Sequence, residues 1–272
     1  MGYLFFHITA TAYLAATLIY TAYLFSHREG LIKGATYALY AGGVAHTVTI
    51  ISRWVEAGRT PATNLHETLT LFSWIIVVLY AAMLYRYRVA VIGAFVAPLA
   101  FLLLITASFL PAEIIPLAPM LESWWLPVHV MLALLGNAFF ALASIFAIMY
   151  LIQDRYLKSR KIQGLYFILP SVEVLDELSY RCLTYGFPLL TLAIITGAIW
   201  SEYALGSYWT WGQRQIWSLI TWFLYAALLH GRLTSGWRGK KSAMLSVVAF
   251  GVLIGSFLLI NVFLGGAHGL LR

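Results

Sequence analysis

Long apolar runs, separated by short polar segments, recur along the whole chain. About eight of them reach the length of roughly 20 residues that an α-helix needs to cross a bilayer. The pattern predicts an all-α, polytopic membrane protein with about eight transmembrane helices. The predicted spans are 3–26, 34–54, 67–85, 89–109, 125–152, 181–201, 215–234 and 243–265.

Helix-breaking and capping residues mark the connections between these runs. Gly58 and Pro61 predict a turn after the second run. Asn64, followed three residues later by Glu67, resembles a capping box that opens the third helix. Prolines in the segment between the fourth and fifth runs prevent a continuous helix there.

The polar segment 153–180 is the only sizeable soluble piece that the pattern leaves. Its portion SVEVLDELSYRCL alternates leucine and valine with acidic residues, which is typical of an amphipathic helix on the inner membrane surface. The sequence shows no internal repeat and no second domain. We therefore expect one integral membrane domain over residues 1–272, with 153–180 as its inner amphipathic segment.

Composition and charge support this interpretation. The chain is 62% hydrophobic and only 10% charged, which excludes an ordinary soluble domain. The opening run lacks the flanks of a cleavable signal peptide, so we expect it to remain as the first helix. The single cysteine, Cys182, excludes an intrachain disulfide and a Cys-x-x-Cys pair.

The net charge of +7 is distributed according to the positive-inside rule. If both termini lie outside, the outer segments hold only Arg53, Arg59, Arg214 and Arg272, and the inner loops hold the other basic residues. The basic excess is thus a signal for orientation in the membrane and gives no support to nucleic-acid binding. It also places the segment 202–217 on the outer face.

The outer segment 202–217 is rich in aromatic residues. Its centre, Tyr208, Trp209, Thr210 and Trp211, lies in a stretch that also holds Trp200, Trp217 and Trp222. One interpretation is an aromatic belt, because Trp and Tyr favour the membrane interface. The other is a platform for a flat, apolar, conjugated ligand such as haem.

Histidines supply candidate ligands for haem iron, which neutral imidazole commonly holds. His129 opens the fifth span and His268 follows the eighth, so both are expected on the outer face with the aromatic segment. His230 lies roughly 22 Å from Gln215 along the seventh span, where it is either a ligand of a second haem position or an interfacial residue. His46 is either a ligand or a partner in a helix–helix hydrogen bond.

Three stretches resemble one known family. GSYWTWGQRQIWSLITWFLYAALLHGR resembles the tryptophan-rich signature of the CcsA/ResC cytochrome c biogenesis proteins, approximately WGxYWxWDPKE followed by a helix that ends in His. RWVEAGRTPATNLHETLTLFSW looks like the second outer motif of that family, and HVMLALLGNAFFALA resembles the helix opened by its first external His. The resemblance covers most of the chain, in order.

The resemblance implies haem handling in a bacterial cytoplasmic membrane, with the tryptophan-rich loop on the periplasmic face. By position, His129 and His268 would be the external ligands of haem b and His230 the transmembrane ligand. Trp209 and Trp211, with Tyr208, would contact the haem. A ResB/CcsB-like partner and apocytochrome c would complete a holocytochrome c synthase, in which this chain would be at most the CcsA-like part.

The signature also departs from the family pattern. Gly212 stands where an Asp is usual, Leu205 replaces the leading Trp, and Arg214 adds a positive charge suited to a haem propionate. These changes leave haem binding expected and open a second interpretation of what the protein does with the haem. The alternative is a HemX-like membrane protein that binds haem and regulates or assists tetrapyrrole synthesis without catalysis.

Overall fold

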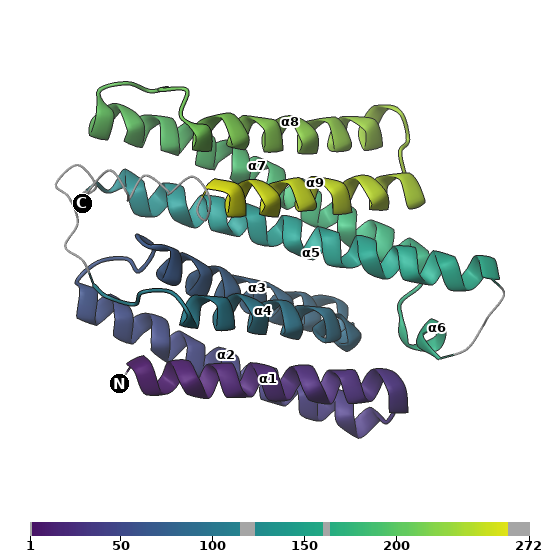
Figure 1. The fold of residues 1–272 in the computed structure, drawn as a ribbon. Coiled ribbons are helices and arrows are strands. Elements are labelled where there is room, and N and C mark those ends of the chain that lie inside the picture. Colours follow the sequence, from purple (N-terminus) through teal and green to yellow (C-terminus); the bar gives the residue numbers. More distant parts are fainter. Residues whose placement is uncertain (1, 115–122, 160–163, 261–272) are drawn as a thin grey trace. The chain divides into compact units, whose positions relative to one another are not determined.

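The structure is a computed structural model that describes residues 2–114, 123–159 and 164–260. Every regular element in these ranges is helical, which confirms the predicted all-α class (Figure 1). The elements are α1 (Gly2–Ser26), α2 (Glu29–Ala57), α3 (Leu65–Tyr87), η1 (Ala90–Ile92), α4 (Gly93–Ser108), α5 (Trp125–Ser159), α6 (Leu165–Ile168), α7 (Val172–Leu205), α8 (Gln213–Thr234) and α9 (Lys240–Leu258).

Seven of the described helices are long and apolar enough to cross a membrane, against about eight predicted. They are α1, α3, α4 with η1, α5, α7, α8 and α9. Helix α2, which contains the predicted span 34–54, is not among these seven. Its 29 residues exceed the length needed, but tyrosines, threonines, glycines and His46 keep its most apolar stretch below the hydropathy of those seven helices. The chain is a polytopic integral membrane protein.

The chain forms two compact units, although one domain was predicted because the sequence shows no internal repeat and no second domain. Unit 1 contains Met1–Ile114 and Ile152–Leu175, and unit 2 contains Ile115–Leu151 and Asp176–Arg272. Helices α5 and α7 each contribute residues to both units. That the two units act as a single haem-handling domain stays a prediction.

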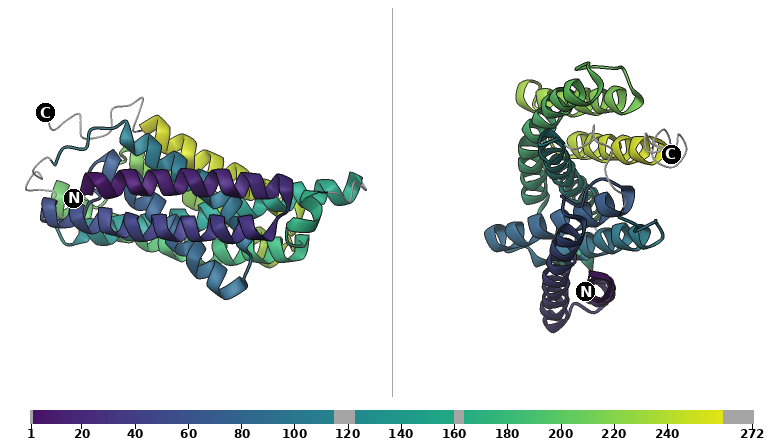
Figure 2. Two further views of the ribbon diagram at one scale, coloured as in Figure 1. Left: turned by 90° about the horizontal axis from the view of Figure 1, so that it is seen from below. Right: turned by 90° about the vertical axis from the view of Figure 1, so that its left-hand side faces the viewer.

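Unit 1 is built on α1 to α4, with α1 and α2 side by side and α3 packed against α4 (Figures 1 and 2). Buried hydroxyls join these helices: Tyr20 Oη lies 2.9 Å from both Tyr80 Oη and Thr36 Oγ1. Gly93, at the start of α4, lies directly against the Tyr20 ring, where any larger residue would overlap it. Close approach at a glycine therefore joins α1 to α4.

Unit 2 contains most of α5 and α7, together with α8 and α9. Phe140 of α5 stacks on Tyr225 of α8, with ring centroids 3.6 Å apart and planes 6° apart. Ser179 of α7 donates a hydrogen bond to the carbonyl of Ala143 in α5. These contacts join α5 to α8 and to α7.

A charged junction fixes the ends of α8 and α9 against α7. The Arg232 guanidinium forms a bidentate ion pair with Asp176, with N–O distances of 2.8 and 2.9 Å. Asp176 also accepts from the backbone N–H of Gly239, and Arg232 donates to Ser242. Bidentate arginine pairs fix geometry as well as charge, so this junction holds the end of α8 against α7.

The segment 153–180 differs from its predicted form. It was expected to carry a separate helix on the membrane surface, but its second half is the first part of the continuous helix α7. The reason is local: between Val172 and Tyr185 the sequence offers no Gly or Pro to end a helix. In the first half, Gln153 of α5 donates to the carbonyl of Tyr166 in α6.

Candidate functional site

His129 lies in the second turn of α5, against the last turns of α7. Its Nδ1 is 2.7 Å from the backbone carbonyl oxygen of Ala193. A carbonyl can only accept, so Nδ1 carries the proton and donates it. Nε2 of the neutral ring is therefore left as an electron-pair donor, the arrangement that metal-binding histidines adopt.

Gly197 of α7 makes room for this imidazole. A side chain there would place its Cβ 2.7 Å from both Cε1 and Nδ1 of His129, too close for any pair of unbonded atoms. Ala193 and Gly197 are one helical turn apart and thus share a face of α7. This face of α7 packs against the His129 imidazole and sets its orientation through the hydrogen bond to the Ala193 carbonyl.

The aromatic loop between α7 and α8 covers residues 206–212. Trp209 and Trp211 meet edge to face, with ring centroids 6.0 Å apart and planes at 84°. Trp211 and Tyr208 are 70% and 60% exposed, so their faces are available to a ligand. Trp211 also adopts a left-handed backbone with φ of 57°, a strained conformation for a bulky residue.

Gln215 holds this loop in place. Its Oε1 accepts hydrogen bonds from the backbone N–H of Thr210, the Thr210 hydroxyl and the backbone N–H of Gly212, at 2.9, 3.1 and 3.2 Å. In this chain the side-chain amide of Gln215 therefore closes the turn into α8, next to the position where Gly212 replaces the expected Asp.

Two further residues of unit 2 are candidates for binding a ligand at the His129 site. Arg214, at the start of α8, places a positive charge directly after the aromatic loop. Trp200, three residues beyond Gly197 on α7, has a buried Nε1–H without a hydrogen-bond partner among the described residues. A buried unpaired donor is costly, and a ligand with an acceptor oxygen would satisfy it.

The other predicted ligands lie elsewhere. His230 is exposed near the far end of α8, beside Gly231, which packs under the Trp237 ring. His46 belongs to unit 1, where it is fully buried and its Nδ1 lies 3.1 Å from the Tyr13 hydroxyl. That contact is the helix–helix hydrogen bond that was one of its two interpretations. His268 lies outside the described residues.

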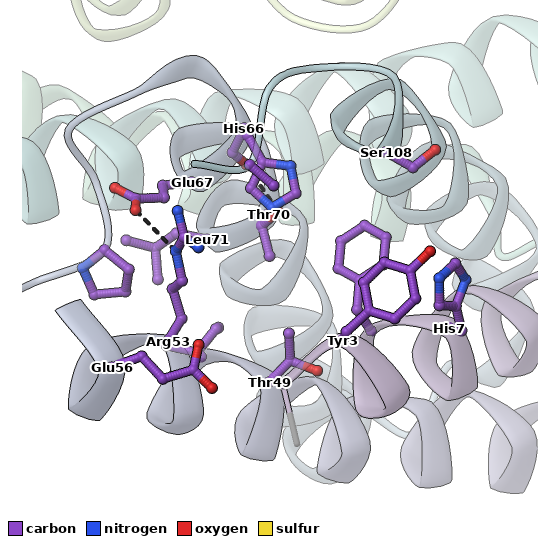
Figure 3. Close-up of a pocket in the computed structure, with 15 residues that line it drawn as sticks. Tyr3, His7, Thr49, Arg53, Glu56, His66, Glu67, Thr70, Leu71 and Ser108 are labelled. Atoms are coloured by element: carbon purple, nitrogen blue, oxygen red, sulfur yellow. Dashed lines mark hydrogen bonds and ion pairs between the residues drawn. The ribbon is translucent and has the colours of Figure 1, made fainter. Parts of the chain in front are cut away.

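Unit 1 contains a cavity of about 310 Å³ at one end of α1 to α4 (Figure 3). Among its lining residues, the buried Glu67 pairs through its carboxylate with Arg53 at 3.0 Å and with Arg59 at 3.6 Å. Glu67 also accepts from the backbone N–H and the hydroxyl of Thr63, each at 3.0 Å. Asn64 caps α3 as predicted, accepting from the Glu67 N–H. In a capping box the Glu67 carboxylate would accept from the backbone N–H of Asn64, but here it accepts from that of Thr63.

Comparison with known proteins places the chain in a family. Residues 62–268 match the cytochrome C assembly protein family. The cytochrome c biogenesis protein CcsA of Guillardia theta is 36% identical, over 87% of this chain and 86% of that protein. CcsA of Pyropia yezoensis is 35% identical, over 94% and 92%. The chain belongs to the cytochrome c assembly family and is of the CcsA type.

This CcsA-type chain also shares its fold with a solved structure, the cytochrome c haem lyase CcmF. The TM-score is 0.70 at 18% identity, over 95% of this chain and 46% of that one. At this identity the likeness concerns the fold alone, and this chain spans about half the length of CcmF. The family match confirms the resemblance inferred from the sequence motifs, and with it a role in cytochrome c assembly.

Within the CcsA-type chain, three contributors to the unit 2 site were not predicted from sequence. They are the Ala193 carbonyl, the space at Gly197 and the amide of Gln215. Backbone carbonyls carry no sequence signal. Gly197 carried a weak one, because a glycine in an apolar helix often marks close packing.

Proposed function

We propose that this protein binds haem at the His129 end of unit 2 and presents it for covalent attachment to apocytochrome c. The supporting observation is the His129 imidazole, whose Nδ1–H donates to the Ala193 carbonyl, so that Nε2 keeps its lone pair for a ligand. Because the family acts in cytochrome c assembly, we propose haem as the ligand of this site.

The residues present fit haem as the cargo of this site. His129 supplies one axial imidazole, and His268 is the proposed second one. Tyr208 and Trp211 offer exposed aromatic faces to the macrocycle, and Trp209, which is half-buried, meets Trp211 edge to face. Arg214 would pair with a propionate, and the unpaired Nε1–H of Trp200 would donate to an acceptor of the ligand.

These side chains would bind and orient haem, and the haem would supply the vinyl groups to which apocytochrome thiols become joined. The exposed faces of Tyr208 and Trp211 leave one side of the loop open to a second chain. Haem attachment itself would need a ResB/CcsB-like membrane partner. We place the loop on the periplasmic face of the bacterial cytoplasmic membrane, with both termini on that side.

Two proposals about other residues depend on this one. His230 would bind haem, of the b type, at the opposite end of α8, where the Asp176–Arg232 junction fixes its helix. His46 would hold α1 to α2 through Tyr13 at its Nδ1, and its buried Nε2, which has no hydrogen-bond partner among the described residues, would be the atom open to a ligand.

Deletion of the gene provides the test. We expect loss of all covalently attached haem from membrane and periplasmic cytochromes, with b-type haem unchanged, and recovery with the wild-type gene. Covalent haem is measured by peroxidase staining of denaturing gels, and b-type haem by reduced-minus-oxidised spectra. Parallel loss of both haem types would contradict the proposal and favour the HemX-like alternative, in which tetrapyrrole synthesis fails.

A further inference from the structure

The unit 1 cavity has an apolar part and a charged part. Its apolar wall is formed by Phe6, Ile50 and Leu71, of which Phe6 and Leu71 are buried. Arg53, Glu56 and Glu67 line its other part (Figure 3). Its volume of about 310 Å³ falls within the range of sites that hold small organic ligands.

The cavity lies at helix ends, where a membrane protein meets lipid head groups. It is lined by the first residues of α1, the last turns of α2, the first turns of α3 and residues at the end of α4. Tyr3 lies at the start of α1 and Trp54 lies near the end of α2, and they are 79% and 53% exposed. Exposed Tyr and Trp at helix ends are typical of the head-group level of a bilayer.

Arg53 keeps one side of its guanidinium open. Its Nε donates to Glu67 at 3.0 Å, and its Nη2 donates to the carbonyl of Glu113 at 3.3 Å. Among the described residues, Nη1 has no protein partner. Because Glu67 is buried, these contacts fix the guanidinium at the cavity edge and leave one donor group for a ligand.

Glu56 is a carboxylate without a partner among the described residues. It lies three residues after Arg53 on α2, about 4.5 Å further along the axis and on the same face. Arg53 forms its ion pair with Glu67 rather than with Glu56, so the charges of Arg53 and Glu56 do not neutralise each other. The cavity edge therefore presents a positive and a negative group side by side, next to an apolar wall.

We propose that the unit 1 cavity binds a zwitterionic phospholipid with a primary ammonium group, as in phosphatidylethanolamine. The phosphate would accept from Arg53, the ammonium would donate to Glu56, and an acyl chain would lie along Phe6, Ile50 and Leu71. An anionic lipid would place its charge beside the unpaired Glu56 carboxylate, which disfavours it. A choline head group cannot donate a hydrogen bond to Glu56.

The test uses the full-length protein in detergent, with lipid binding measured by native mass spectrometry. The probes are short-chain phosphatidylethanolamine, phosphatidylcholine and phosphatidylglycerol, together with glycerophosphoethanolamine, which lacks acyl chains. We expect phosphatidylethanolamine to bind about threefold or more tightly than the other two lipids. Glycerophosphoethanolamine should bind weakly, because it cannot use the apolar wall.

Glu56→Gln should reduce the preference for phosphatidylethanolamine to near one, since it removes the ammonium partner. Its side chain is exposed and unpartnered, so folding should be unaffected. Glu113→Gln is the matched control, because that exposed carboxylate lies outside the cavity lining. Equal binding of the three lipids, a stronger binding of phosphatidylglycerol, or an unchanged preference in Glu56→Gln would overturn the proposal.

Discussion

Replacing Glu67 by alanine is expected to destabilise unit 1 by about 3–5 kcal/mol, the usual cost of breaking a buried ion pair. The Glu67 carboxylate is buried, and Arg53, Arg59 and Thr63 all direct hydrogen-bond donors or positive charge at it. Its loss would leave two arginines near the membrane interface without their shared partner. It would also release the turn that begins α3.

Denaturation of the purified protein in mixed micelles measures this change in the free energy of unfolding. Glu56→Ala is the matched control: it removes an exposed carboxylate from the same end of unit 1 and should change stability by less than about 0.5 kcal/mol. A Glu67→Ala variant as stable as this control would show that the Glu67 cluster contributes little to unit 1.

Gly197→Ala is expected to reduce haem retention about tenfold or more, close to the effect of removing His129 itself. The new Cβ would lie 2.7 Å from Cε1 and Nδ1 of His129, so the imidazole would have to leave the Ala193 carbonyl. A displacement of about 1 Å is enough for a ligand-binding group to lose most of its effect. Helix propensity acts in the other direction, because alanine favours a helix more than glycine does.

The measurement is haem content per protein after purification, from the pyridine haemochrome spectrum. Gly251→Ala is the matched control, since this glycine lies in α9 of unit 2 and a side chain there would meet nothing within 4 Å. It should retain wild-type haem. If Gly197→Ala also retained wild-type haem, His129 would not hold iron in the orientation described here.

Most of the fold could be predicted because bilayer-spanning helices have a strong sequence signal. The predicted spans match α1 and α3 to within two residues at each end. The length of α7 was underestimated because charged residues such as Glu173 and Asp176 were taken as a boundary. A helix can extend beyond the apolar region, so hydropathy marks the span but not the end of the helix.

The exceptions to the charge pattern have a structural reason. Arg53 and Arg59 are two of the few basic residues predicted on the outer side, and both pair with Glu67. Their spacing in sequence gave no sign of this, because ion pairs between a helix end, a turn and the next helix have no fixed period. Glu67 was noticed only as a capping residue, which identified the right position and only part of its role.

The unit 2 site could be predicted in its side chains but not in its geometry. His129, Trp209, Trp211 and Arg214 were selected from residue type and topology, and all four lie in unit 2. The position of the proton on His129 depends on the Ala193 carbonyl, 64 residues away in sequence. Only the packing of α5 against α7 brings the two together.

The optical spectrum of the purified, reduced protein tests the proposed haem site most directly, in the wild type and in His129→Gly with and without added imidazole. The wild type should show the sharp low-spin bands of bis-imidazole haem. His129→Gly should lose them, and free imidazole should restore them by replacing the missing ring. A wild-type spectrum in His129→Gly would contradict His129 as a ligand, and a wild-type spectrum in His268→Ala would contradict His268.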